Sequence, residues 1–138
     1  MRQKPCLTHE DVRILAEACR EKAMTQQLAV TIAIVDDGGH LWHLERLDAR
    51  PSTIEVAIGK ARTAALMRAP SAALEDLIKD MPGILALNAM PLRGALPVMV
   101  GDDCVGAIGV SGAQPVDDES IAEAGRTALT AYGPLGAG

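Results

Sequence analysis

The stretch Gly106-Ala-Ile-Gly-Val-Ser-Gly-Ala113, followed directly by Gln114-Pro-Val-Asp-Asp-Glu119, decides the fold of this 138-residue chain. Its apolar and small residues predict a strand that ends at Ser111-Gly112, and the chain then breaks at Pro115 and enters an acidic helix. Glycine within a strand gives up side-chain packing and costs conformational entropy. The three glycines therefore predict that a helix, another subunit or a ligand comes close to this backbone.

Apolar spacing along the rest of the chain predicts two hairpins embedded among helices. We expect helices over residues 8–26, 52–68 and 71–79 and a last helix starting at Asp117, with strands over 30–35, 40–47, 98–100 and 104–110. The predicted helix caps are Thr8 with Asp11, the box Ser52-Thr-Ile-Glu55, Ser71, and Asp117. Asp36-Asp-Gly-Gly39 is typical of a hairpin turn. Paired hairpins predict an α+β domain in which helices pack on an antiparallel sheet.

The composition fits one domain over residues 1–138 and excludes several classes of partner. Hydrophobic residues make up 49% of the chain, but Trp42 and Tyr132 are its only aromatic residues. The net charge is −5 and there is no basic run, so we expect no nucleic-acid partner. No apolar stretch approaches the ~20 residues that span a bilayer. The polar start, Met1 to Pro5, lacks a secretory signal, so we expect a cytoplasmic protein.

The three cysteines form no CxxC pair, which argues against a zinc knuckle or a disulfide framework. We expect them to be small buried residues. The predicted helix over 52–68 has apolar residues on two faces: Ile54, Ala57, Ile58, Ala61 and Ala65 on one, and Val56, Thr63 and Met67 on the other. We expect another subunit to cover the second face.

Several charged and polar residues are candidates for a site, although each alone is commonly a solvated charge or a turn former. Arg46, Lys60 and Arg93 would suit a carboxylate-bearing ligand if they converged. A partly buried lysine can act as a base or imine former. His40 and His43 are three apart on a predicted strand, so they make a poor chelating pair, although either could supply one axial ligand to haem. Gly109-Val-Ser-Gly112 is not the nucleophile elbow of hydrolases.

Five segments together resemble the GlcG/HbpS-like family, also called the haem-degrading domain family. They are Ile34-Val-Asp-Asp-Gly-Gly39, Arg46-Leu-Asp48, residues 52–64, Pro91-Leu-Arg-Gly94 with Pro97, and residues 105–113 with Asp117-Asp-Glu119. The resemblance covers residues 8–132 and implies a profilin/PAS-like fold. It also implies a homo-oligomer, often an octamer built from dimers. The family includes a haem-binding sensor, a domain of a corrinoid adenosyltransferase and proteins encoded with organic acid catabolism, so fold does not settle function.

The resemblance leaves three functions open. The first is an oligomeric small-molecule-binding protein with haem or a related tetrapyrrole as default ligand and His40 or His43 on the iron. Its pocket residues are expected to be Arg46, Arg93, Gly94, Ser111, Gly112 and Asp118. The second is a catabolic enzyme that hydrates, hydrolyses or tautomerises a small carboxylate-bearing intermediate, an enamine, imine or muconate-like acid, with Lys60, Glu55 or Glu119 moving the proton. The third is a structural or regulatory oligomer without ligand. The sequence does not decide whether the protein is an enzyme.

Overall fold

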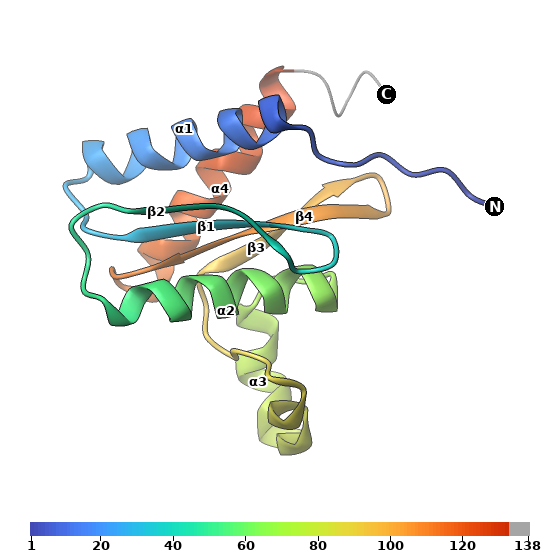
Figure 1. Cartoon of the computed structure of the whole chain (residues 1–138). Coiled ribbons are helices and arrows are strands. Elements are labelled where there is room, and N and C mark those ends of the chain that lie inside the picture. The colour runs from blue at the N-terminus through green and yellow to red at the C-terminus, as the bar shows by residue number, and fades with distance from the viewer. Residues whose placement is uncertain (133–138) are drawn as a thin grey trace.

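A computed structural model describes residues 1–132 and shows a four-stranded antiparallel sheet with helices on both faces. In chain order the elements are α1 (His9–Thr25), β1 (Thr31–Asp36), β2 (Leu41–Arg46), α2 (Ser52–Met67), α3 (Ala72–Asp80), the 3-10 helix η1 (Pro82–Leu87), β3 (Ala95–Val100), β4 (Asp103–Ser111) and α4 (Pro115–Tyr132). The strands lie in the order β2-β1-β4-β3. Helices α1 and α4 cover one face and α2 the other, while α3 and η1 project beyond α2 (Figure 1). The predicted α+β class is confirmed.

Local chemistry explains the first helix and the first hairpin. Thr8 Oγ1 accepts the Asp11 N–H at 3.2 Å and the Asp11 carboxylate accepts the Thr8 N–H at 2.8 Å, which is the predicted capping box. In the hairpin, one carboxylate oxygen of Asp36 accepts the N–H groups of Gly38 and His40, each at 2.9 Å. Gly39 has φ +83°, a conformation that glycine adopts without strain. Both predicted features are confirmed.

Two predicted boundaries and two predicted caps are wrong. Ser71 makes no side-chain capping hydrogen bond at the start of α3. Helix α2 begins at Ser52 after Pro51, and no side chain caps it, so Ser52-Thr-Ile-Glu55 does not form a capping box. Helix α4 begins at Pro115 rather than Asp117, because proline suits the first turn, where its missing N–H has no helical partner. Strand β3 begins at Ala95 rather than at residue 98. It contains Pro97, which an edge strand tolerates.

Two chemically different cores lie on the two faces of the sheet. The α1/α4 face is filled by large side chains: Leu15, Ile32, Ile34, Ile108, Ile121 and Leu129. The α2 face is filled almost entirely by alanines: Ala33, Ala57, Ala61, Ala64, Ala65, Ala95 and Ala107, with Val35. Small side chains let α2 lie close to the sheet. A Cβ on Gly109 would stand 2.6 Å from the Ala61 nitrogen, so the close approach predicted from the glycines is, at this position, a helix.

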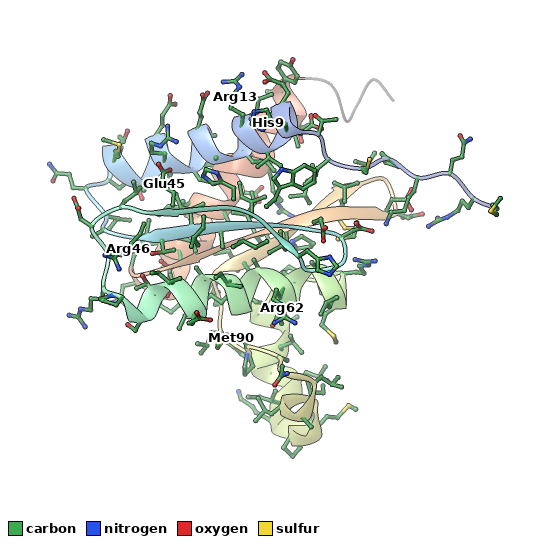
Figure 2. All side chains as sticks on the ribbon, viewed as in Figure 1. His9, Arg13, Glu45, Arg46, Arg62 and Met90 are labelled. Carbon is green, nitrogen blue, oxygen red and sulfur yellow. The ribbon has the colours of Figure 1, made fainter. Side chains whose placement is uncertain are left out.

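The outer face of α2 is crossed by the chain itself. Thr63 Oγ1 accepts the Met90 N–H at 2.8 Å, and the Met90 side chain packs where a Cβ of Gly59 would be. Arg62 and Met90 both lie on this side of the sheet (Figure 2). The prediction that another subunit covers the second face of this helix is therefore wrong for Thr63, while Leu66 and Met67 near the end of α2 are exposed.

None of the helices in residues 1–132 is long and apolar enough to cross a membrane. The three cysteines are free; Cys19 and Cys104 are buried as predicted, whereas Cys6 is exposed. Burial raises the pKa of the Cys19 thiol to about 12, so this thiol stays protonated near neutral pH.

The alanine layer predicts that Gly109→Ala destabilises the fold, because the added methyl group must push α2 away from the sheet. We expect the free energy of unfolding in urea to fall by about 1–3 kcal/mol. Gly83→Ala is the matched control, since a Cβ there meets no atom of residues 1–132 within 4 Å, and its effect should stay within about 0.5 kcal/mol. Equal effects of the two changes would contradict this account of the packing.

The thiol environments predict selective labelling of the native protein. At about pH 8, near the usual thiol pKa, a thiol reagent should modify Cys6 rapidly and leave Cys19 and Cys104 unmodified until the protein is unfolded. Mass spectrometry of the labelled protein reads this directly. Rapid native labelling of Cys19 would show that the α1/α4 core opens.

Candidate functional site

A buried ion pair joins α2 to α4 past the end of the sheet. Lys60 Nζ lies 3.2 Å from Asp118 Oδ2 and donates a hydrogen bond to the Val110 carbonyl at 3.0 Å. The other Asp118 oxygen accepts the Ala113 N–H at 3.0 Å. The two side chains are only 5% and 2% exposed. The short turn from β4 into α4 sets the carboxylate where the lysine emerges from α2.

Gly94 forms the cover over this pair. Its φ of +136° lies in the left-handed region, and a Cβ there would stand 2.7 Å from Lys60 Nζ and 2.8 Å from the Val110 oxygen. Glycine is thus required both for the backbone conformation and for the space that the ammonium occupies. The sequence singled out Gly94 as a ligand-binding residue, and the structure places it directly against Lys60 and Asp118.

Burial raises the pKa of Asp118 above its ordinary value, against the opposing effects of the Ala113 N–H and Lys60. An acid with a raised pKa in the folded state favours folding most below its unfolded pKa. That contribution is lost as the pH rises through the folded value. At neutral pH the buried carboxylate is costly to keep ionised, and the Lys60 ammonium offsets part of that free-energy cost. In this closed arrangement, Lys60 holds two helices together and is not open to a substrate.

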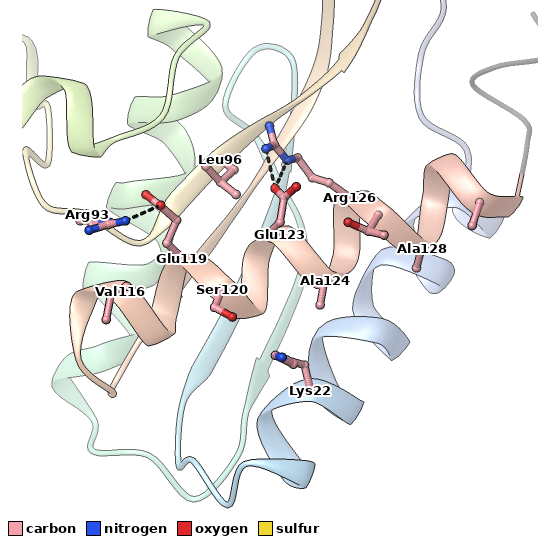
Figure 3. Close-up of a pocket in the computed structure, with 12 residues that line it drawn as sticks. Lys22, Arg93, Leu96, Val116, Glu119, Ser120, Glu123, Ala124, Arg126 and Ala128 are labelled. Carbon is pink, nitrogen blue, oxygen red and sulfur yellow. Dashed lines mark hydrogen bonds and ion pairs between the residues drawn. The ribbon is translucent and has the colours of Figure 1, made fainter.

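Arg93 and Glu119 lie outside the buried pair. Arg93 Nη2 is 3.0 Å from Glu119 Oε1, and the Arg93 backbone N–H donates to the Glu75 carboxylate at 2.6 Å. The two side chains line an open groove of about 720 Å³ along α4, with Lys22, Leu96, Ser120, Glu123 and Arg126 among its other walls (Figure 3). Both arginines of this groove are matched by carboxylates, Arg93 by Glu119 and Arg126 by Glu123, so within residues 1–132 Lys22 is its one cation outside the ion pairs.

The remaining candidate residues are distributed over the chain. Ser111 is buried at the end of β4, and Gly112, with φ +131°, packs against the Ala29 carbonyl. Arg46 is exposed at the end of β2 and Glu55 is exposed in the first turn of α2. The structure thus gathers Lys60, Gly94, Ser111 and Asp118 at one end of the sheet. Arg46 and Glu55 lie exposed outside that cluster.

The two histidines of the β2 segment have different surroundings. His43 lines a cleft of about 210 Å³ between α1 and β2, and its Nε2 is buried without a hydrogen-bond partner among residues 1–132. His40 is 84% exposed, and its Nδ1 lies 3.4 Å from Asp36 Oδ1. It follows Gly39, whose Cβ position faces the side chains of Arg62 and Leu66 on α2. The described part of the chain has no cluster of three His, Cys, Asp or Glu residues that could hold a metal ion.

Sequence reasoning missed a groove on the outer face of α2. It has a volume of about 330 Å³ and is lined by Arg62, Thr63, Leu66, Met67, Leu87, Asn88 and Ala89. The available signal was the pair Leu66-Met67, which continues α2 beyond its alanine stripe. Residues 87–89 come from an irregular segment, so no local pattern placed them beside α2.

The fold and most of the sequence match one known family. The family model described as Haem degrading protein HbpS-like matches residues 7–127. The chain belongs to the HbpS-like family. The GlcG protein of Escherichia coli K12 is 35% identical over 116 residues, which cover 80% of this chain and 85% of GlcG.

Two solved structures superpose on this HbpS-like chain over nearly its whole length. A double mutant of Streptomyces reticuli HbpS superposes with a TM-score of 0.86 at 32% identity, covering 92% of this chain and 89% of that one. The PduOC:heme complex superposes with a TM-score of 0.83 at 26% identity, covering 90% and 95%. The family predicted from the sequence is therefore confirmed. A small-molecule-binding role is consistent with these relatives.

The buried pair generates a prediction about stability. Lys60→Ala leaves the Asp118 carboxylate buried without its cation, so the free energy of unfolding at neutral pH should fall by about 3–5 kcal/mol. The loss of unfolding free energy should be smaller at about pH 4, where the Asp118 carboxyl, with its raised pKa, is partly protonated.

The double variant Lys60→Met/Asp118→Asn is the control, because it removes both charges and keeps the volume. It should be more stable at neutral pH than Lys60→Ala in urea denaturation. A Lys60→Ala protein as stable as the wild type would show that the pair does not hold α2 to α4.

Proposed function

We propose that this HbpS-like protein binds haem or a related tetrapyrrole on the outer face of α2, with His40 as the iron ligand. The observation that carries the proposal is the environment of the His40 imidazole. Asp36 Oδ1 lies 3.4 Å from its Nδ1, and the His40 side chain is 84% exposed. Ligating histidines commonly have a carboxylate on the second ring nitrogen, which fixes the ring and raises its basicity. Bound haem would supply an iron atom that accepts one imidazole nitrogen.

The groove on the outer face of α2 suits a largely apolar ring with acidic substituents. Gly39, which precedes His40, faces two side chains of its wall, Arg62 and Leu66. Leu66, Met67 and Leu87 expose apolar surface there, and Arg62 is available to a propionate. None of the ion pairs found among residues 1–132 involves Arg62, in contrast to Arg93, which is held by Glu119. The α2 groove has a volume of about 330 Å³, which falls within the range of about 300–1,000 Å³ that is usual for small-molecule sites.

His43 is the second candidate ligand, because its Nε2 has no partner in the described residues. Its cleft of about 210 Å³ is smaller than usual ligand sites. The two arginines of that cleft are paired, Arg13 with Glu17 and Arg20 with Glu45. Fewer groups remain there to receive propionates, so His43 serves as the matched control for His40.

The catabolic enzyme remains a prediction that no observation here favours. Lys60 is closed off, and Glu55 lies on an exposed part of α2 away from it. The assembly also belongs to the proposal: we infer from the family resemblance a cytoplasmic homo-oligomer built from dimers, up to an octamer.

Titration of the purified protein with ferric haem, followed by absorbance, tests the ligand. The wild type should show a saturable Soret band at up to one haem per chain. His40→Ala should weaken binding at least tenfold, equal to about 1.4 kcal/mol, and Arg62→Ala should weaken it to a smaller extent. His43→Ala and Arg46→Ala should bind as the wild type does.

Loss of the band in His43→Ala with binding retained in His40→Ala would move the site to the α1/β2 cleft. Weak, unsaturable binding by the wild type would contradict the haem proposal. A screen of small carboxylates for turnover and thermal stabilisation would then test the enzyme prediction.

A further inference from the structure

The two edges of the sheet are treated differently, and the β3 edge is closed. The Ala95 N–H donates to Ser71 Oγ at 3.0 Å, and the Ala95 carbonyl accepts the Ser71 N–H at 3.0 Å. The next outward position is Pro97, which has no N–H, and its carbonyl accepts Arg126 Nη1 at 3.0 Å. These groups leave no continuous row of donors and acceptors on β3 for a further strand.

The β2 edge is open. Leu47 donates its N–H to the Val30 carbonyl, which makes Leu47 and Val30 a hydrogen-bonded pair. Hydrogen-bonded and non-hydrogen-bonded pairs alternate along an antiparallel ladder. In the observed register, Thr31 with Arg46 and Ala33 with Leu44 are therefore non-hydrogen-bonded pairs. Leu44 and Arg46 direct their N–H and C=O groups away from β1. Among residues 1–132, no turn or side chain hydrogen bonds to these four groups.

The side chains on this edge are apolar and exposed. Leu41 is 49% exposed, Trp42 is 43% and Leu44 is 37%. Trp42 is the only tryptophan of the chain. Edge strands of isolated proteins are usually protected by charged residues, proline, a bulge or a covering segment. Strand β2 carries Glu45 and Arg46 and pairs irregularly with β1 at Trp42, but it contains no proline, and no hydrogen bond from another segment of residues 1–132 covers the outward groups of Leu44 and Arg46. An apolar edge that is open in this way marks a place where another strand pairs. In the view of Figure 1, strand β2 passes in front of β1.

We propose that the β2 edge pairs antiparallel with the β2 edge of a second copy of this chain, with the two-fold axis at Leu44. Only residues with outward backbone groups can face one another as hydrogen-bonded pairs, which limits the register. An axis at Glu45 would oppose two glutamates, and an axis at Arg46 would oppose two arginines. Like charges directly opposite are destabilising.

The axis at Leu44 avoids both conflicts and is self-complementary. It places Leu44 against its own copy and each Glu45 against the His43 of the other chain. Glu45 and His43 lie on the same face of β2, because residues two apart in a strand share a face. The axis runs perpendicular to the sheet, so the two four-stranded sheets join into one and both α2 helices lie on the same side.

This inference rests on the homo-oligomeric part of the proposed function and not on haem binding. Its first test is the mass of the native protein by native mass spectrometry or sedimentation, for the wild type, Leu44→Lys and Leu44→Glu. The wild type should be an even-numbered oligomer. Each variant alone should have half that mass, because two like charges meet at the axis. Mixing the two variants should restore the wild-type mass through lysine–glutamate pairs.

Circular dichroism and haem titration of the same variants separate the possible failures. A folded Leu44→Lys protein with the wild-type mass would overturn the inference, as would a monomeric wild type. Absent haem binding with the expected changes in mass would contradict the haem proposal and leave the strand pairing intact.

Cross-linking tests the register without relying on these variants. In a Cys6→Ser background, Leu44→Cys should form an intermolecular disulfide on mild oxidation. A hydrogen-bonded antiparallel pair has Cα atoms about 5.5 Å apart, within disulfide range. Leu85→Cys, exposed on η1, is the matched control and should remain monomeric on a denaturing non-reducing gel. Equal cross-linking of both variants, or none at Leu44→Cys, would overturn the proposed register.

Discussion

The close contact between α2 and the sheet sets the positions of the groups around it. Gly109 and the alanines facing it let the helix lie almost on the strand backbone, where a single added methyl group has no room. The low position of α2 allows Lys60 to reach past the end of the sheet to Asp118 and the Val110 carbonyl. Gly94 allows a similarly close approach, because the Lys60 ammonium lies where a side chain at this position would be.

Buried charge in this protein connects two helices, whereas the proposed haem site uses exposed groups. Removing Lys60 and Asp118 from water costs free energy that their attraction offsets only in part, as the raised pKa of Asp118 shows. Such a pair is a specific link between two helices on opposite faces of the sheet. The groups proposed to meet a ligand lie elsewhere: His40 on the hairpin turn and Arg62 on the outside of α2. Scaffold and proposed binding surface therefore use different residues, although both depend on α2.

The sheet is similarly divided between a closed and an open edge. Ser71, Pro97 and Arg126 come from three separate elements, yet together they occupy the outward groups of β3. Within residues 1–132 no such set of groups covers β2, whose Leu41, Trp42 and Leu44 stay exposed in a single chain. If β2 pairs with its own copy, the haem surface proposed on α2 occurs twice on one side of the joined sheet. Ligand binding and assembly would then share that side without sharing residues.

Elements with local signals could be predicted from the amino-acid sequence. The Thr8–Asp11 box, the Asp36–Gly39 turn and the glycine-rich strand β4 depend on neighbouring residues, and the family resemblance extends over nearly the whole chain. Tertiary structure alone decided the burial of Lys60, because that depends on how close α2 lies to the sheet. It also decided the α2 groove and the closed β3 edge, since their walls come from distant segments. Spacing along a chain reports which face a residue occupies, but not which distant segment will lie against that face.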